Sequence, residues 1–439
     1  MAALRQRGSL SQSGKLRLSE TTAVFKKRRG RKRTVRTFAH FLDSRVFVDT
    51  YDVIINGGGL AGSALALALA QNRWTVLLIE RGELPSLEVS LSNWQSRIYA
   101  FAPRPWGWLE RLGVELPLAR AQAVFKMIVR GDRGSRLEFA AETVPLPYLA
   151  MIAEAEAIRF ALWQQIQKLS GVTIATGESA QLVAAEWLGE SVTVTTADGR
   201  RASARLLVGA EGRTSWVREA ARLTAEVFPY EHHAVVANFA CEKEHRGVAY
   251  QWFRDDGVLA YLPLAGKRTS IVWSTQPARA EQLLAASAED FAAEVAAAGD
   301  RVLGRLTLIT PPNRFPLSLL RCPKVTARRV LLIGDAAHGI HPLSGHGVNL
   351  GFNDAATFSE LLGEKTPVKD PGDPLLLIRY ARQRFTEPFL LQSVTDALAR
   401  GFGLAHPLIQ RVRNWGMEVV DRLPGLKTHL IRYATLAQW

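Results

Sequence analysis

Cysteine is scarce in this sequence. The 439 residues include only Cys241 and Cys322, and no C-x-x-C pair is present. Two distant cysteines cannot form a disulfide framework, so we expect reduced, buried thiols in a reducing compartment. The missing C-x-x-C pair also argues against a disulfide reductase.

Long hydrophobic runs are missing as well. No apolar stretch reaches the roughly 18 residues that a membrane-spanning helix needs. The N-terminal region lacks the long apolar core of a secretory signal. The apolar content of 47% is ordinary for a globular protein, and the length suits two or more domains.

Acidic residues are depleted at the N-terminus. Residues 1–50 hold 13 Lys/Arg and three Asp/Glu, so +10 of the formal charge of +14 lies there, much of it in KKRRGRKR at 26–33. Such a block is usually disordered and solvated, so we expect a dispensable tail. A targeting segment, translated sequence upstream of the true start, and nonspecific contact with anionic lipid or RNA remain alternatives. No specific nucleic-acid partner is predicted.

The most informative stretch is 51–81, YDVIINGGGLAGSALALALAQNRWTVLLIER. It predicts a buried strand, a glycine turn, a helix and a second strand that ends on Glu80. Gly57, Gly59 and Gly62 have the G-x-G-x-x-G spacing: the first turns sharply, the second admits a pyrophosphate, and the third lets the helix pack on the strand. The helix start offers unpaired N–H groups, and Glu80 can accept from a ribose. Dinucleotide binding is predicted; the alternative is a glycine-rich turn without a ligand.

Two further buried strands end in glycine and an acid. Residues 206–208 precede GAEGRTSWVR, which contains Glu211, and residues 328–333 precede Gly334 and Asp335. In an open parallel sheet, ligands bind beyond the carboxyl ends of the strands. Three such ends suit one long ligand with adenine, ribose, pyrophosphate, a ribityl chain and a flat ring. A nicotinamide dehydrogenase is disfavoured because no second G-x-G-x-x-G has its own βαβ unit.

The remaining patterns extend the fold prediction. Residues 223–275 alternate with a period of two, which predicts an antiparallel sheet, and 278–298 predicts two helical pieces. A helical pattern is also predicted from Arg97 to Leu112. The predicted fold class is α/β, with a Rossmann-like dinucleotide-binding domain, an inserted antiparallel β-sheet substrate domain and a C-terminal helical region.

These motifs together resemble the flavin-dependent aromatic hydroxylases of the para-hydroxybenzoate hydroxylase class. Within that class the chain is most similar to the ubiquinone-biosynthesis hydroxylases. The resemblance spans about residues 51–435 and leaves the basic tail without a counterpart. The matching stretches are the G-x-G-x-x-G with Glu80, Arg97 in SRIYAF, GAEGRTSWVR from Gly209, GDAAHGIHPLSGHGVNLGFNDA (334–355), RYARQRF (379–385) and RNWGMEVVDRLPGLK (413–427).

The resemblance implies FAD as the cofactor and NADPH or NADH as a transient reductant. The three glycines would hold the FAD pyrophosphate, Glu80 the adenosine ribose and Asp335 the ribityl hydroxyls. Arg97 would face the pyrophosphate or ribityl region. No protein nucleophile is implied. The ring-side candidates are Pro342, His346 and Gly347, and the implied cofactor-binding residues are Gly57, Gly59, Gly62, Glu80, Arg97, Glu211, Gly334, Asp335, Pro342, Gly345, Gly347 and Asn349.

Three positions depart from the family pattern. Glu211 stands where the family has aspartate, so its carboxylate reaches one methylene further. His346 stands where glutamine is usual, and an imidazole with an unperturbed pKa of about 6.5 titrates near neutral pH. Gln95 replaces a common aspartate. His338, His341 and His346 lack a cysteine or carboxylate that would complete a zinc site, so no metal is predicted.

The resemblance also implies the reaction. NAD(P)H reduces FAD, dioxygen gives a C4a-hydroperoxide, and the ring of a (poly)prenylated phenol or quinol is hydroxylated in ubiquinone biosynthesis. The stretch 257–263 is expected to form one wall of an apolar aromatic pocket, with an exit for a prenyl chain among the C-terminal helices. A flavin-dependent prenyl reductase and a non-catalytic flavin-binding assembly protein are the alternatives.

A prenylated substrate also implies where the protein is located and which partners it contacts. We expect a cytoplasmic protein with peripheral contact at the inner face of the membrane, and contacts with a lipid carrier or with ubiquinone-biosynthesis proteins. The predicted boundaries are 1–50 (basic tail), 51–122, 151–222 and 318–365 (three parts of the FAD-binding domain), 123–150 and 223–317 (substrate domain), and 366–439 (C-terminal helical region).

Overall fold

The structure is a computed structural model that describes residues 48–83, 94–116, 118–132, 134–340 and 347–403, with part of 420–432. The basic tail and part of the predicted C-terminal helical region lie outside these residues. No helix within the described ranges is long and apolar enough to cross a membrane.

The dinucleotide stretch folds as its pattern predicts, into strand β1 (Asp49–Asn56), helix α1 (Leu60–Gln71) and strand β2 (Val76–Glu80). Side chains on both faces of β1 are fully buried, including neighbouring Ile54 and Ile55. Burial on both faces is typical of a strand inside a parallel sheet with both sides covered. The alanine- and leucine-rich α1 has high intrinsic helix propensity and buries most of its length.

β1 lies in the middle of an eight-stranded sheet with the order β18-β19-β11-β1-β2-β8, extended by β10 beside β11 and β9 beside β10. Four neighbouring pairs are parallel: β19 with β11, β11 with β1, β1 with β2, and β2 with β8. Asn56 lies opposite Gly209, and Gly209 lies opposite Leu332. The three predicted strand ends therefore meet at one edge of the sheet. The other strands are β8 (Val172–Thr176), β9 (Leu182–Leu188), β10 (Ser191–Thr196), β11 (Arg201–Gly209), β18 (Thr326–Ala327) and β19 (Val330–Leu332).

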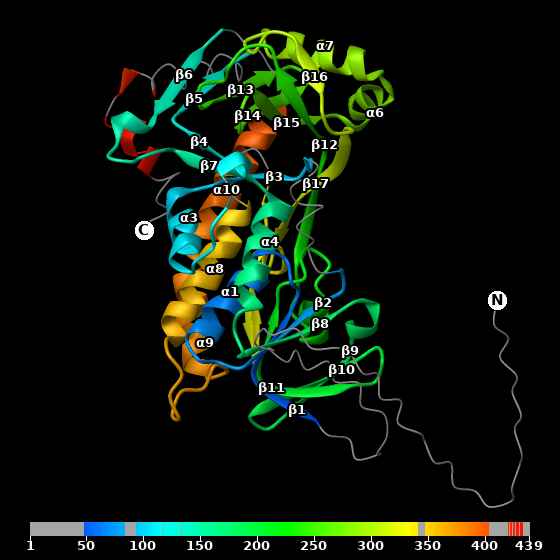
Figure 1. Ribbon diagram of the computed structural model, residues 1–439, viewed down its shortest axis with the longest axis vertical. Helices are drawn as coiled ribbons and strands as arrows, with labels where there is room; N and C mark the ends of the chain where they lie inside the picture. The colour runs from blue at the N-terminus through cyan, green and yellow to red at the C-terminus, as the bar shows by residue number, and fades with distance from the viewer. Residues whose placement is uncertain are drawn as a thin grey trace, which may run out of the picture. The chain divides into compact units, whose positions relative to one another are not determined.

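Helices cover one face of this sheet. The cores of α1, α4 and α8 merge with inward side chains of β1, β2 and β11, and Figure 1 shows α1, α8 and α9 side by side. The β9–β10 hairpin and α5 pack against the other face. The bounds are α4 (Ala155–Ile166), α5 (Trp216–Ala220), α8 (Gly347–Leu362), α9 (Pro374–Gln383) and α10 (Thr386–Gly403).

A nine-stranded sheet follows the order β20-β17-β12-β15-β14-β13-β5-β6, with β16 beside β12. All pairs among β12 to β15 are antiparallel, which confirms the prediction for 223–275. The two predicted helical pieces, α6 and α7, cover one face. The bounds are β5 (Lys126–Arg130), β6 (Arg136–Ala140), β12 (Glu226–Cys241), β13 (Val248–Arg254), β14 (Gly257–Leu264), β15 (Arg268–Thr275), β16 (Leu306–Leu308), β17 (Asn313–Arg321), β20 (His338–Gly339), α6 (Pro277–Ala285) and α7 (Ala288–Ala298).

A small sheet with the order β3-β7-β4 corrects one expectation. The helical pattern predicted from Arg97 is wrong in its first part, because Ile98–Phe101 forms strand β3. Antiparallel pairing with β7 overrides the local pattern, and the helix begins only at Pro103. The remaining elements are α3 (Pro103–Arg111), β4 (Ala121–Val124), β7 (Ala150–Glu154), and the 3₁₀ turns η1 (Leu118–Arg120), η2 (Ala141–Thr143), η3 (Glu178–Ala180) and η4 (Gly334–Ala336).

Both cysteines are free thiols. Cys241 is buried in the core beneath α7, and burial raises its pKa to about 12. Cys322 is half-buried, and burial also raises its pKa. Neither thiol is an activated nucleophile, because reactivity requires the thiolate.

Candidate functional site

The three glycines between β1 and α1 occupy three different environments. Gly57 has φ +112°, and a Cβ there would lie 2.5 Å from the carbonyl carbon of Ala210. A Cβ on Gly62 would lie 1.9 Å from the Gly57 oxygen. A Cβ on Gly59 would meet no atom within 4 Å. The first and third glycines thus permit close packing, whereas the second faces open space at the start of α1.

The N-terminus of α1 offers its own N–H groups to a ligand. Gly59 is the N-cap, no side chain caps it, and the first turn carries no acidic residue. The first N–H groups of a helix have no partner within the helix, and the helix dipole places partial positive charge there. An anion such as a pyrophosphate fits this position.

Glu80 lies beside this turn, at the end of β2. Its Oε1 accepts from the N–H of Gly82 at 2.8 Å, and its Oε2 would lie 3.1 Å from a Cβ on Gly58. The carbonyl of Gly58 is held by Ser63 Oγ at 2.9 Å and by Trp163 Nε1 at 3.2 Å. Trp163 reaches the turn from α4, about a hundred residues along the chain, so local spacing does not predict this contact.

Arg97 and Asp335 approach the same edge from two other segments. Arg97 Nε donates to Tyr99 Oη at 2.8 Å. The Tyr99 oxygen, with help from the Asp335 and Glu156 carboxylates, raises the pKa of Arg97. Burial raises the pKa of Tyr99, and the nearby Asp335 charge adds to the rise. Asp335 is half-buried in η4 and makes no hydrogen bond with the described residues, so its oxygens remain available to a ligand.

Glu211 lies in the turn that follows β11. Its Oε1 accepts from Asn56 Nδ2 at 3.1 Å and from the Val217 N–H at 2.7 Å. Its Oε2 is buried without a partner in the part of the chain that the structure describes. Burial raises its pKa, although these hydrogen bonds oppose the rise. The carboxylate therefore joins the end of β1 to the start of α5, and its contact with a cofactor stays a prediction.

Asp354 forms a buried network that our sequence analysis missed. Its side chain is 0% exposed. It accepts from the Gly334 N–H at 2.9 Å, His338 Nε2 at 2.7 Å and Arg384 Nε at 2.7 Å. Arg384 also pairs with Glu387, three positions further along. Asp354 and Arg384 both lie in stretches that carry the family resemblance, but sequence spacing does not indicate that they meet.

The ring-side candidates are only partly described. Helix α8 begins at Gly347. Asn349 Oδ1 accepts from the Ala102 N–H at 2.9 Å, and Asn349 Nδ2 donates to the Ala100 carbonyl at 2.8 Å. Asn349 thereby ties α8 to the β3–α3 junction. Three further candidates lie outside the described residues: Pro342, Gly345 and His346.

Glu154 is a buried carboxylate at the end of β7. It is 1% exposed, and its Oε2 accepts from Arg120 Nη1 at 2.7 Å. Its Oε1 accepts from the Gln95 N–H at 2.6 Å. Burial raises its pKa, and the hydrogen bonds and the Arg120 charge oppose that rise. Glu154 therefore fixes the segment that leads into Arg97.

The described residues fit a long dinucleotide. Gly59 leaves room at a helix N-terminus, Glu80 stands beside that turn, and Asp335 has free acceptor oxygens near Arg97. All three positions lie at or just beyond the ends of parallel strands whose carboxyl ends meet at one edge. FAD has an anionic centre for the helix start and hydroxyl donors for the acids, so the donor and acceptor set matches it.

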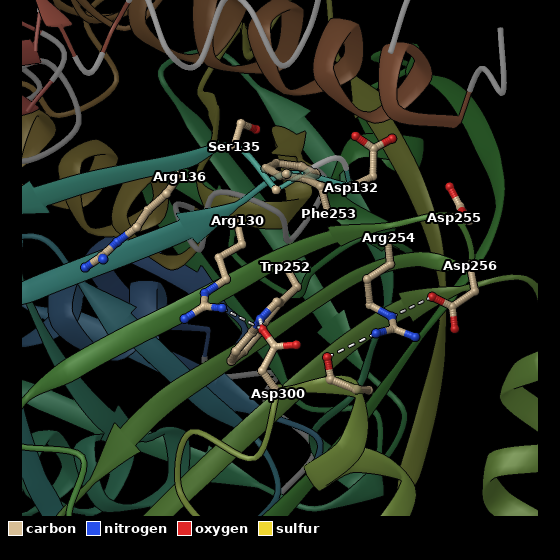
Figure 2. A pocket seen from close by; sticks show the side chains of 13 residues that line it. Arg130, Asp132, Ser135, Arg136, Trp252, Phe253, Arg254, Asp255, Asp256 and Asp300 are labelled. Atoms are coloured by element: carbon tan, nitrogen blue, oxygen red, sulfur yellow. Dashed lines mark hydrogen bonds and ion pairs between the residues drawn. The ribbon is translucent and has the colours of Figure 1, made fainter. Parts of the chain in front are cut away.

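A polar pocket of about 780 Å³ lies elsewhere, beside β5, β6, β13 and the end of α7. Figure 2 shows two ion pairs in this pocket, Arg130 with Asp300 and Arg254 with Asp256. Arg130 Nη1 and Trp252 Nε1 donate to Asp300, and Arg254 Nε donates to Asp256. The pocket contains none of the predicted cofactor residues, so it is not the candidate site.

Comparison with known proteins gives a consistent result. The family described as "FAD binding domain" matches residues 50–388. Ubiquinone hydroxylase UbiL of Rhodospirillum rubrum is 33% identical over 386 residues, which cover 87% of this chain and 89% of that protein. The 3-demethoxyubiquinol 3-hydroxylase of Escherichia coli is 31% identical over 388 residues, which cover 87% and 98%.

A solved structure is similar in fold. That of PqsL, a probable FAD-dependent monooxygenase from Pseudomonas aeruginosa, matches with a TM-score of 0.70 and 22% sequence identity. The match covers 84% of this chain and 100% of the PqsL chain. At this identity the likeness concerns the fold alone.

Proposed function

We propose that this chain, which belongs to the FAD binding domain family of FAD-dependent monooxygenases, hydroxylates the aromatic ring of a (poly)prenylated phenol or quinol in ubiquinone biosynthesis. The observation that carries the proposal is the convergence of three strand ends, with Asn56 opposite Gly209 and Gly209 opposite Leu332. This convergence sets a glycine turn and two acidic positions along one edge, as an elongated cofactor requires.

In this proposal the residues of the protein bind the cofactor and orient the substrate. The start of α1 holds the pyrophosphate of FAD, Glu80 a ribose, and Asp335 the ribityl hydroxyls. Bound FAD supplies the redox chemistry: it takes a hydride from NADPH or NADH and activates dioxygen for transfer to the ring. The chain's task is to place an electron-rich ring beside the cofactor and to keep water away.

Two observations support the proposed substrate class. The curated relatives are named for hydroxylation of ubiquinone or demethoxyubiquinol. The face of the antiparallel sheet opposite α6 and α7 carries the half-buried side chains of Ala260, Leu262 and Val272, which suit an apolar ring. The aromatic residue of the 257–263 stretch, Tyr261, packs on the other face instead, where its Oη donates to the Val295 carbonyl at 2.5 Å.

Oxygen labelling tests the proposed reaction. The purified protein should be yellow, should oxidise NADPH or NADH when a prenylated phenol is added, and should place one atom of ¹⁸O₂ in the product. A reduced product without label would instead support a prenyl reductase. Tightly bound FAD without NAD(P)H oxidation would support a binding or assembly role. Complementation of strains that each lack one quinone-ring hydroxylation would identify the ring position.

We also propose peripheral association with a membrane or a lipid carrier. Its support is the exposed apolar surface of α9, α10 and the turn between them, where Leu375, Phe385 and Phe389 are 75%, 64% and 51% exposed. Phe385 and Phe389 stack with ring centroids 5.7 Å apart. Replacement of Phe385 and Phe389 with serine should reduce partitioning onto anionic vesicles, and unchanged partitioning would reject this part of the proposal.

A further inference from the structure

The two faces of the antiparallel sheet differ in their access to solvent. Leu259 and Trp273 point toward α6 and α7 and are 0% exposed. On the opposite face, Ala260, Leu262 and Val272 are only half-buried, although β14 and β15 are both flanked by other strands. The small sheet covers part of this face, because Leu262 packs against the cluster that β4 and β7 form with β14, while Ala260 and Val272 beside it stay partly accessible.

Asn238 on β12 and Ser270 on β15 lie on this same face, in its buried part. They are direct cross-strand partners, and Ser270 in turn lies opposite Leu262 on β14. Cross-strand partners hold their Cβ atoms about 4.5–5.5 Å apart on the same face. The two polar side chains are therefore neighbours at the border of the half-buried apolar patch.

Both side chains carry a buried polar atom without a partner. Asn238 is 0% exposed and Ser270 is 1% exposed. Within the part of the chain that the structure describes, neither Asn238 Oδ1 nor Ser270 Oγ has a hydrogen bond. Buried polar atoms are nearly always paired, so two orphans side by side indicate a missing partner.

The orientation of the Asn238 amide follows from its other contact. Asn238 Nδ2 donates to the Gln95 carbonyl at 2.8 Å, and its backbone N–H donates to Thr310 Oγ1 at 2.9 Å. The unpaired atom is therefore the amide oxygen, which only accepts. Ser270 Oγ can both donate and accept. One hydroxyl group placed between them would donate to Asn238 and accept from Ser270, which satisfies both atoms.

This pair is linked to the candidate site through Gln95. Gln95 lies two positions before Arg97, whose charge interacts with Asp335 at the cofactor edge. The Gln95 backbone is fixed on both sides, by Asn238 at its carbonyl and by Glu154 at its N–H. The orphan pair thus borders the segment that carries a predicted cofactor residue.

We propose that Asn238 and Ser270 form the polar subsite that binds a ring hydroxyl of the aromatic substrate, while Ala260, Leu262 and Val272 contact its apolar part. The proposal rests on the proposed function and adds the residues that orient the ring. A hydroxyl held at one end of an apolar wall selects phenols and quinols over rings without oxygen. An unpaired polar group is a strong basis for such discrimination, because a ligand without the hydroxyl leaves both atoms unsatisfied.

Ser270→Ala in the FAD-loaded protein is the direct test, since it removes only the orphan hydroxyl. Binding of 2-prenylphenol and of prenylbenzene, which lacks the ring hydroxyl, is followed by the change in flavin absorbance. We expect Ser270→Ala to weaken 2-prenylphenol binding roughly fivefold to tenfold, the range of one hydrogen bond, and to leave prenylbenzene binding unchanged. Ser274→Ala, on the same strand and face, should bind both compounds as the wild type does.

Thermal unfolding without substrate separates the subsite from a structural water. Removal of an unpaired hydroxyl should leave the unfolding midpoint unchanged or raise it. A lower midpoint with unchanged 2-prenylphenol affinity would mean that Ser270 bonds a buried water, and this result would overturn the subsite. Equal affinity of wild type and Ser270→Ala would overturn it too.

The outcomes also distinguish the subsite from the proposed function. If wild-type protein retains FAD but binds neither compound, the proposed function fails and the subsite fails with it. If wild type binds both compounds equally, the substrate class survives and the subsite alone is rejected. Asn238→Leu gives a second variant, in which a similar loss restricted to 2-prenylphenol supports the pair.

Discussion

The backbone N–H of Gly334 donates to Asp354 Oδ2 over 2.9 Å, so a fully buried carboxylate on α8 holds the glycine turn that precedes Asp335. Gly334 has φ +60°, a conformation that other residues rarely adopt. Asp354 also accepts from Arg384 Nε at 2.7 Å, and Arg384 lies between α9 and α10. The position of a predicted cofactor residue therefore depends on a charge cluster between helices.

Asp354→Asn should destabilise both the fold and the cofactor turn. Loss of the negative charge leaves the buried Arg384 poorly compensated, and breaking such a pair costs about 3–5 kcal/mol of unfolding free energy. Urea unfolding and the rate of FAD release measure the two effects. Glu364→Gln is the matched control, because Glu364 pairs with Arg73 at 59% and 80% exposure, where a pair contributes about 0–1 kcal/mol. Equal losses in the two variants would contradict this role of Asp354.

Gly59→Ala and Gly62→Ala should separate cofactor binding from folding. The added Cβ of Gly59→Ala meets no protein atom, so the variant should unfold as wild type does but bind FAD more weakly, on the order of tenfold. The Cβ of Gly62→Ala would lie 1.9 Å from the Gly57 oxygen and should cost about 1–3 kcal/mol of stability. Fluorescence titration with FAD and chemical denaturation of both variants are the measurements. Normal FAD affinity in Gly59→Ala would argue against a phosphate at this turn.

Asp52 should contribute to stability at neutral pH and lose that contribution in acid. Burial acts to raise its pKa, but bonds from Lys365, Thr75 and Arg205 outweigh burial and hold the pKa at about 2. A carboxyl group whose pKa is lower in the folded than in the unfolded state stabilises the fold at pH values above its unfolded pKa, near 4. This stabilisation is lost as the pH falls toward 2. Asp52→Asn should therefore lower the unfolding free energy at pH 7 by about 2 kcal/mol. Denaturation from pH 7 to pH 2 should show the two proteins converging in acid; a constant gap would refute the linkage.

Glu211 should show the opposite dependence on pH. Burial raises the pKa of Glu211 in the folded protein. Its contribution to folding stability is therefore fully present at pH values below its unfolded pKa, and it is lost as the pH rises through its folded pKa. Glu211→Gln keeps an oxygen for the Val217 N–H and carries no charge, so its stability should fall less than that of wild type between pH 4 and pH 8. Glu211→Ala should be less stable at every pH in this range. FAD affinity in Glu211→Ala and Glu211→Asp tests the separate prediction of a cofactor contact.

The local patterns predicted the parts of the site that lie close together in the chain. Gly57, Gly59, Gly62 and Glu80 belong to one βαβ unit of about thirty residues, whose hydrophobic periods and glycine spacing are visible in a single stretch. The structure around Arg97 was predicted incorrectly. Its neighbours Ile98–Phe101 become a strand only through pairing with β7, more than fifty residues away.

The sequence by itself determined the order of strands, glycine turns and helices, because hydrophobic periodicity and backbone freedom act over a few residues. Only the tertiary structure decided which distant groups share a buried environment, such as Asp354 with Arg384, Glu154 with Arg120, and Asn238 beside Ser270. The physical reason is that burial makes each polar atom dependent on one specific partner, and the chain brings those partners together only when the sheets and helices pack.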